Sequence, residues 1–158
     1  SLADWTVSQF DPSLSWNDIA EINKQWGGKF IIKGVMDPED AKAAVDVGAD
    51  AIVVSNHGGR QLDGAISSIA ALPDIVDAIG DKCEVWMDSG IRTGQDILRA
   101  VALGARGTLI GRAFAYGLGA NGQAGVTKTL EILHRELDLT MGLCGRTSLE
   151  KIDSSIII

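Results

Sequence analysis

A histidine and an arginine stand three residues apart in a glycine-rich loop that follows a buried-looking apolar run. The loop is Ser-Asn-His-Gly-Gly-Arg-Gln-Leu-Asp, residues 55–63, and the run begins at Ala51. A neutral imidazole can take a proton from a substrate near neutral pH. A guanidinium can hold a carboxylate through two parallel hydrogen bonds. His57 and Arg60 therefore predict a catalytic base and a carboxylate clamp for a small organic acid.

A structural role is the competing interpretation of the same two residues. In that interpretation His57 bonds to the backbone and Arg60 pairs with Asp63. The place of the loop after a strand favours function, because the working residues of parallel α/β proteins gather where strands end. Both interpretations stay open on the sequence alone.

Two glycine–arginine pairs follow the later apolar runs. They are Gly90 with Arg92 and Gly111 with Arg112. Glycine lets backbone N–H groups approach an anion, and a following helix N-terminus adds positive potential. Barrel proteins commonly bind phosphate in the loops after their last two strands. The pairs predict a phosphate site, and the alternative is tight turns with surface charges.

Lys33 and Asp88 also stand at the ends of apolar runs. A lysine that points inward needs an anionic partner or a lowered pKa. Lys33 could therefore balance negative charge on a reduced cofactor ring, or simply reach solvent. Asp88 could accept hydrogen bonds from sugar hydroxyls, or cap the next helix. Neither the acidic residues nor the two cysteines have metal-ligand spacing, so no metal site is predicted.

Four short apolar runs alternate with helical patterns and would position these side chains. The runs are residues 30–35, 51–55, 85–88 and 108–111, and the helical patterns are residues 16–25, 37–48, 66–79 and 93–103. Continuous runs bounded by glycine are typical of parallel strands covered on both faces. The alternation predicts an α/β fold with a parallel sheet. All four strand ends then lie along one edge of that sheet.

Composition narrows the function classes. The chain has 158 residues, a net charge of −7 and 46% hydrophobic residues, so it can bury a core. The acidic balance argues against a nucleic-acid partner bound through general electrostatics. No apolar run approaches the roughly 20 residues that span a bilayer. Two cysteines fit a reducing, cytoplasmic compartment.

The number of strands predicts part of a larger barrel. Doubly wound sheets usually have five or six strands and a (β/α)8 barrel has eight, whereas this chain offers four. The chain also opens on Ser1 rather than Met, with an irregular stretch over residues 1–15. We therefore expect residues 1–158 to be a single segment, the second half of a barrel. A complete small α/β protein is the alternative.

The strand-end motifs resemble the FMN-dependent L-2-hydroxy-acid oxidases and dehydrogenases, a family that includes glycolate oxidase, mandelate dehydrogenase and bacterial L-lactate dehydrogenases. The resemblance runs from about residue 10 to residue 150 and is carried by residues 32–34, 54–63, 88–92 and 109–112. Residues 9–16 and 34–41 are most similar to the lactate dehydrogenase branch. The implied fold is the C-terminal half, strands 5–8, of a TIM (β/α)8 barrel.

The resemblance implies FMN as the cofactor and gives each candidate residue a role. His57 would be the catalytic base and Arg60 the carboxylate clamp. The cofactor-binding residues would be Lys33, Ser55, Asp88, Gly90, Arg92, Gly111 and Arg112. Among them, Lys33 would contact the flavin ring, Ser55 would lie beside flavin and substrate, and Asp88 would bind the ribityl chain. The remaining four would hold the phosphate.

The resemblance also implies partners. The substrate would be a small 2-hydroxy acid, with L-lactate expected, and the electron acceptor a quinone, a cytochrome or oxygen. The N-terminal half of the same barrel would complete the fold, and the assembly would be a homo-oligomer, a tetramer by resemblance. Peripheral attachment at the inner face of a membrane is an alternative to a purely cytoplasmic location. Two further functions stay open: an FMN-binding, phosphate-binding or self-associating half-barrel without turnover, and a flavin-free barrel enzyme such as an isomerase.

Overall fold

The computed structural model of the chain describes residue 5, residues 8–9 and residues 11–157. Its strands are β1 (Ile31–Val35), β2 (Ala51–Val54), β3 (Glu84–Met87) and β4 (Gly107–Thr108). They form a four-stranded sheet in the order β1-β2-β3-β4, and every neighbouring pair is parallel. The predicted parallel α/β fold is confirmed. The strands therefore all end along one side of the sheet, which we call the carboxyl edge, opposite the amino edge.

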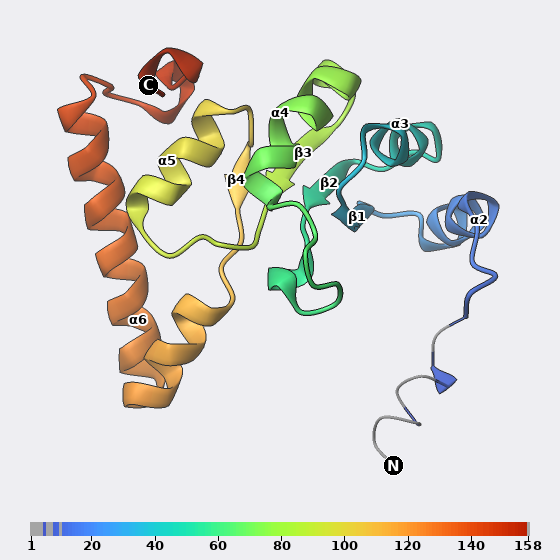
Figure 1. Cartoon of the computed structure of the whole chain (residues 1–158), viewed down its shortest axis with the longest axis horizontal. Coiled ribbons are helices and arrows are strands. Elements are labelled where there is room, and N and C mark those ends of the chain that lie inside the picture. Colours follow the sequence, from blue (N-terminus) through green and yellow to red (C-terminus); the bar gives the residue numbers. More distant parts are fainter. Residues whose placement is uncertain (1–4, 6–7, 10, 158) are drawn as a thin grey trace.

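The helices alternate with the strands. They are α2 (Trp16–Trp26), α3 (Pro38–Asp46), α4 (Ser68–Ile79), α5 (Gly94–Ala102) and α6 (Arg112–Leu143). In Figure 1 the sheet lies in the middle, with α2 and α3 on one side and α5 and α6 on the other. Short 3-10 turns add η1 (His57–Gly59) after β2, η2 (Gly80–Lys82) before β3, and η3 (Leu149–Lys151) and η4 (Ser154–Ile156) after α6.

Side-chain caps explain where two of these helices begin. The Asp37 side chain accepts a hydrogen bond from the backbone N–H of Glu39, and Pro38 occupies the first helical position of α3. Thr93 and Asp96 form a capping box at the start of α5. Both starts agree with the sequence-based expectation. They also fix where the preceding loop, which leaves the carboxyl edge, must stop.

Three elements differ from the sequence-based expectation. The strand predicted over residues 108–111 is confined to Gly107–Thr108, because the chain turns into α6 directly afterwards. The helix predicted from residue 66 begins at Ser68 and accommodates Pro73 without a break in helical geometry. The irregular stretch predicted over residues 1–15 lies partly outside the described residues, which omit residues 1–4, 6–7 and 10.

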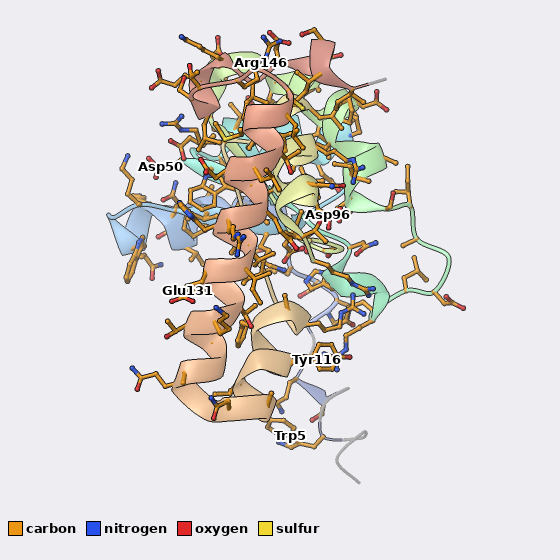
Figure 2. All side chains as sticks on the ribbon, turned by 90° about the vertical axis from the view of Figure 1, so that its left-hand side faces the viewer. Trp5, Asp50, Asp96, Tyr116, Glu131 and Arg146 are labelled. Carbon is orange, nitrogen blue, oxygen red and sulfur yellow. The ribbon has the colours of Figure 1, made fainter. Side chains whose placement is uncertain are left out.

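The last helix folds back on itself. Backbone angles leave the helical range at Asn121 and at Gly122, so α6 consists of two arms. The arms approach so closely that a Cβ added at Gly125 would lie 1.8 Å from the carbonyl oxygen of Gly117. Figure 2 looks onto this side of the molecule, with Tyr116 on the first arm and Glu131 on the second. The second arm packs on α5, where Gly94 donates its N–H to Glu136.

The core lies between one face of the sheet and the helices. Fully buried side chains of the two central strands, such as Ile52 and Met87, pack with Leu72 and Ile75 of α4. On β2 every residue is buried, as predicted for strands covered on both faces. On β1 and β3 that prediction is wrong, because only the last residue of β1 and alternate residues of β3 are buried, and Ile31 is 55% exposed. The helices among the described residues cover one face of these two strands.

No helix in the described part of the chain is both long enough and apolar enough to cross a membrane.

Candidate functional site

A cavity of about 670 Å³ opens at the carboxyl edge of the sheet. All the predicted site residues except Ser55 line it: Lys33, His57, Arg60, Asp88, Gly90, Arg92, Gly111 and Arg112. They come from the ends of all four strands, so the parallel topology brings together residues up to 79 positions apart in the sequence. Ser55 is buried directly beneath, where it bonds to Lys33.

An ion pair between Lys33 and Asp88 spans the ends of β1 and β3. The Lys33 Nζ lies 3.0 Å from Asp88 Oδ2 and donates to Ser55 Oγ, also at 3.0 Å. Ser55 follows β2, which lies between the other two strands, so three neighbouring strand ends share one polar cluster. The lysine is 41% exposed and the aspartate 18%. Lys33 therefore has its anionic partner and still presents its ammonium to the cavity.

The environment of Asp88 keeps it ionised. Burial raises the pKa of the Asp88 carboxyl, but hydrogen bonds from Ser55, Lys33 and Ser89 and the charge of Lys33 outweigh burial, so the net pKa is lowered. The alternative that Asp88 caps the next helix is wrong, since Thr93 is the N-cap of α5. Asp88 thus carries a fixed negative charge beside the cavity.

The loop after β2 turns sharply and places His57 in the cavity. His57 has a left-handed backbone (φ 56°), and the two glycines that follow continue it. The imidazole lies against β1, where a Cβ added at Gly34 would come within 2.8 Å of His57 Cε1. Gly34 therefore leaves the space that the imidazole occupies. The imidazole makes no hydrogen bond to any residue that the structure describes, and Cε1 is the ring atom that lies nearest to Gly34.

Arg60 is exposed on the rim of the cavity. Among the described residues it forms no ion pair with Asp63 or with any other acid, which departs from the structural interpretation considered for this pair. Its guanidinium is therefore available to an anion that enters the cavity. Together His57 and Arg60 offer a proton acceptor and a carboxylate-binding fork on the same loop.

The far end of the cavity has the composition of an anion site. Arg112 is the first residue of α6, so the N-terminus of that helix and the guanidinium add positive charge at one place. A Cβ added at Gly90 or Gly111 would meet nothing within 4 Å, so their backbone borders open space. The backbone N–H of Arg92 is bonded to Asp96. The Arg92 guanidinium takes no part in that bond and can bind a ligand.

Sequence reasoning missed one residue that the structure places at the centre of this site. Ser89 has a left-handed backbone (φ 71°), donates from Oγ to Asp88 Oδ1 at 2.8 Å and accepts the N–H of Gly58 at 2.9 Å. The available signal was a serine set between Asp88 and Gly90 at a strand end, where a tight turn favours glycine.

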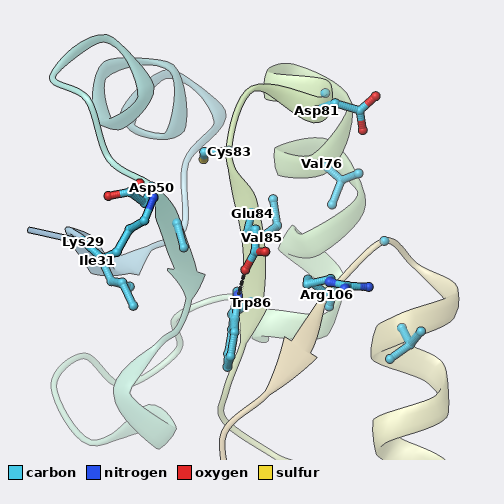
Figure 3. A pocket seen from close by; sticks show the side chains of 15 residues that line it. Lys29, Ile31, Asp50, Val76, Asp81, Cys83, Glu84, Val85, Trp86 and Arg106 are labelled. Carbon is cyan, nitrogen blue, oxygen red and sulfur yellow. Dashed lines mark hydrogen bonds and ion pairs between the residues drawn. The ribbon is translucent and has the colours of Figure 1, made fainter. Parts of the chain in front are cut away.

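A second cavity, of about 790 Å³, opens at the amino edge (Figure 3). Its charged lining includes Arg106, the ion pair Lys29–Asp50, and Glu84, which accepts a hydrogen bond from the Trp86 indole. No group of three or more metal-ligating side chains occurs among the described residues at either edge. The predicted site residues other than Ser55 all line the first cavity, and none of them lines the second.

Comparison with known proteins identifies the family. The family model described as FMN-dependent dehydrogenase matches residues 1–158. The chain belongs to this family. The resemblance inferred from the strand-end motifs is therefore confirmed, and FMN is the cofactor on which the family depends.

The relatives are L-lactate dehydrogenases. Those of Caulobacter sp. (strain K31) and Pseudomonas syringae pv. syringae (strain B728a) are each 54% identical to this chain, over 153 and 154 residues. These matches cover 97% and 98% of this chain and 40% of each relative. The chain thus spans about 40% of the length of these relatives.

Solved structures agree with the family. A mandelate oxidase crystallised with (S)-4-hydroxymandelic acid is 46% identical, with a TM-score of 0.89 over 94% of this chain and 41% of the oxidase chain. A mandelate oxidase mutant holding a monooxide FMN adduct is 46% identical, with a TM-score of 0.85 over 90% of this chain and 45% of that one. The four-stranded parallel sheet is therefore part of a (β/α)8 barrel, as predicted.

Proposed function

We propose that this chain supplies the FMN-binding and substrate-binding residues of an L-2-hydroxy-acid dehydrogenase that oxidises L-lactate to the 2-keto acid. The observation that supports it most is one cavity in which His57 and Arg60 face the Lys33–Asp88 pair. The L-lactate dehydrogenases that are 54% identical to the chain support the choice of substrate. Because the chain spans about 40% of their length, the activity belongs to the whole enzyme.

The residues of the cavity fit FMN. Open glycine backbone, two arginines and the N-terminus of α6 suit its phosphate: Gly90, Arg92, Gly111 and Arg112. Asp88 would accept hydrogen bonds from the ribityl hydroxyls. Lys33, with Ser55 beside it, would lie by the ring and offset the negative charge that the ring gains. When bound, FMN accepts the two electrons that leave the substrate.

His57 acts as the proton acceptor. Oxidation of a 2-hydroxy acid to a 2-keto acid removes two electrons and two protons, and an imidazole nitrogen of His57 takes one of these protons. Among the described residues, no protein hydrogen bond of the imidazole has to break before it acts. The absence of a side chain at Gly34 leaves room for the ring against β1, so the ring meets the substrate at a fixed position.

Arg60 orients the substrate. Its guanidinium would donate two parallel hydrogen bonds to the carboxylate and place the adjacent carbon between His57 and the cofactor. The lack of an ion pair with Asp63 leaves this fork free for the substrate.

The proposed partners are a small 2-hydroxy acid, the N-terminal half of the barrel, and a quinone, cytochrome or oxygen as electron acceptor. The proposed assembly is a homo-oligomer, in the cytoplasm or at the inner face of a membrane.

The Arg60→Lys variant tests the assignment. Lysine keeps the charge but lacks the planar fork, so kcat/KM for L-lactate should fall at least about tenfold, while bound flavin stays unchanged. Arg106→Lys, at the amino edge, is the matched control and should change neither quantity. An unchanged kcat/KM in the Arg60 variant, or a loss of flavin from it, would contradict the role.

A module that binds flavin without turnover is the second candidate. The exposed residues of β1 and β3 favour it, because an apolar sheet face such as that around Ile31 needs a covering partner. A bound flavin that stays oxidised with every 2-hydroxy acid tested would support this candidate over the dehydrogenase.

A further inference from the structure

The loop that carries His57 is held by side-chain oxygens on four successive backbone N–H groups. The pairs are Asn56 with Ser68 Oγ at 3.1 Å, His57 with Ser55 Oγ at 3.1 Å, Gly58 with Ser89 Oγ at 2.9 Å and Gly59 with Asn56 Oδ1 at 3.1 Å. A loop of this length normally leaves such donors to water. The backbone around the imidazole is thus fixed residue by residue.

Two of these oxygens lead back to the ion pair beneath the cavity. Ser55 Oγ accepts from Lys33 Nζ, and Ser89 Oγ donates to Asp88 Oδ1. Each partner of the ion pair is therefore connected, through one hydroxyl, to one of two adjacent N–H groups in the loop. The cluster that faces the cofactor side of the cavity and the loop that carries the base form one hydrogen-bonded unit.

The backbone of Ser89 adopts an unfavourable conformation to make its contacts. Its φ of 71° lies in the left-handed region, which glycine enters at much lower cost than serine. The hydroxyl is used twice, as donor to Asp88 and as acceptor from Gly58. Residues held in such conformations cluster at functional sites, where the surrounding contacts maintain them.

The backbone of Gly58 is held through both its N–H and its carbonyl oxygen. Ser89 holds its N–H, and Arg112 Nη2 donates to its carbonyl oxygen at 3.3 Å. Arg112 begins α6 at the phosphate end of the cavity, whereas Ser89 lies at the end of β3. Removing the Ser89 hydroxyl would release the N–H of Gly58 and leave its carbonyl oxygen bonded to Arg112. The His57 loop could then shift without unfolding.

We propose that Ser89 is a positioning residue for His57, whose hydroxyl ties the Gly58 amide to the Asp88 carboxylate and so sets the place of the imidazole relative to Lys33. This inference rests on the proposed function, in which His57 is the base. In this role Ser89 neither accepts nor donates the proton that is transferred. It acts through the backbone on the carboxyl side of His57.

Two substitutions in the holoenzyme separate the hydroxyl from the backbone conformation. Ser89→Ala removes the hydroxyl and keeps a side chain in the left-handed region, whereas Ser89→Gly removes it and relieves that strain. Both should lower kcat about tenfold, since displacement of a reacting group by about 1 Å can cost up to about a hundredfold. The KM for L-lactate and the FMN content should stay unchanged.

A readout independent of turnover follows the same contact. Hydrogen exchange at the Gly58 amide, followed without substrate, should be at least about tenfold faster in both variants, because the amide loses its only described partner. The matched control is Ser13→Ala, which removes another hydroxyl that donates to a nearby carboxylate, that of Asp11. This control should leave kcat and the Gly58 exchange rate unchanged.

The outcomes distinguish the positioning role from its alternatives. Wild-type kcat in Ser89→Gly would overturn the proposal, because the backbone conformation alone would then matter. A fall in kcat accompanied by loss of flavin or by a raised KM would also overturn it, as general loosening of the site. If His57→Asn keeps full turnover, the proposed function fails instead, whatever the Ser89 variants show.

Discussion

The two edges of the sheet each have a cavity and an ion pair, but the hydrogen bonds around the two ion pairs differ. Each has a cavity of several hundred cubic ångströms and a lysine–aspartate pair. At the amino edge Lys29 is 87% exposed and its pair with Asp50 ends at the backbone of Phe30. At the carboxyl edge the pair Lys33–Asp88 continues through two serine hydroxyls into the loop of His57.

Charged residues beside a cavity are therefore not enough to identify a functional site. What separates the two edges is backbone that is held in costly conformations by side-chain oxygens. Among the described residues, the non-glycine residues with positive φ are His57 and Ser89, and both lie at the carboxyl edge. Conformational strain kept in place by its surroundings is a signature of sites that need fixed geometry.

Replacing each of the two histidines by asparagine should give the largest difference in turnover. His57→Asn removes the proton acceptor and should lower kcat about a thousandfold, within the range that general acid–base catalysis supplies. His134→Asn, on the exposed face of α6, should leave kcat unchanged. Steady-state turnover with L-lactate, measured with the flavin content of each sample, checks the contrast. Equal activity of the two variants would contradict the role of His57 as the proton acceptor.

Two glycines with nearly identical backbone geometry, one at each edge, provide a matched pair of substitutions. Gly34 has φ 102° and a Cβ there would lie 2.8 Å from His57 Cε1, while Gly104, at the amino edge, has φ 101° and a Cβ there would lie 2.8 Å from Val76 Cγ1. Either glycine→alanine change should cost about 1–3 kcal/mol of stability through the backbone alone.

Only the first of these changes should reach the chemistry. Gly34→Ala displaces the imidazole and should lower kcat by about tenfold to a hundredfold, whereas Gly104→Ala displaces a methyl group and should leave kcat unchanged. Denaturant unfolding and turnover, measured on both variants, separate the two effects. A matching loss of kcat in the Gly104 variant would show that turnover responds to stability rather than to the place of His57.

The acid dependence of stability should give the smallest contrast. The pKa of Asp88 is lowered in the folded state, so its ion pair stabilises the protein above the ordinary aspartate value of 3.8 and is lost as pH falls through the folded pKa. Asp88→Asn should therefore cost about 1 kcal/mol or less near pH 7, allowing for solvent screening, and the gap to the parent should narrow as the pH falls below the ordinary value of 3.8 and through the lowered folded pKa.

The amino-edge aspartate provides the control for this measurement. Hydrogen bonding from Lys29 lowers the pKa of Asp50 as well, but that carboxylate pairs with an exposed lysine and touches no catalytic loop. Asp50→Asn should change stability with the same sign of pH dependence and leave turnover unchanged. Urea unfolding midpoints of both variants from pH 7 to pH 3 test this, and a pH-independent gap for Asp88→Asn would contradict the ion pair's role.

The sequence allowed most of the fold and the membership of the cavity to be predicted. The apolar runs and the helical patterns between them predicted the order of strands and helices, and the parallel topology then required strand-end residues to meet. The hydrogen bond from Gly58 to Ser89 could not be predicted, because it joins residues 31 positions apart and depends on a backbone conformation that serine seldom adopts. The short length of β4 could not be predicted either, because the apolar residues after Thr108 continue into a turn.

The visible spectrum of the purified flavoprotein, recorded anaerobically before and after L-lactate, tests the central claim most directly. We expect flavin bands that bleach with L-lactate in the parent protein and, in His57→Asn, bands that are present but do not bleach on the same timescale. Bleaching at the same rate in both would contradict the assignment of His57 as the base. Absence of flavin bands from a parent sample supplied with FMN would contradict the assignment of the carboxyl edge as the cofactor site.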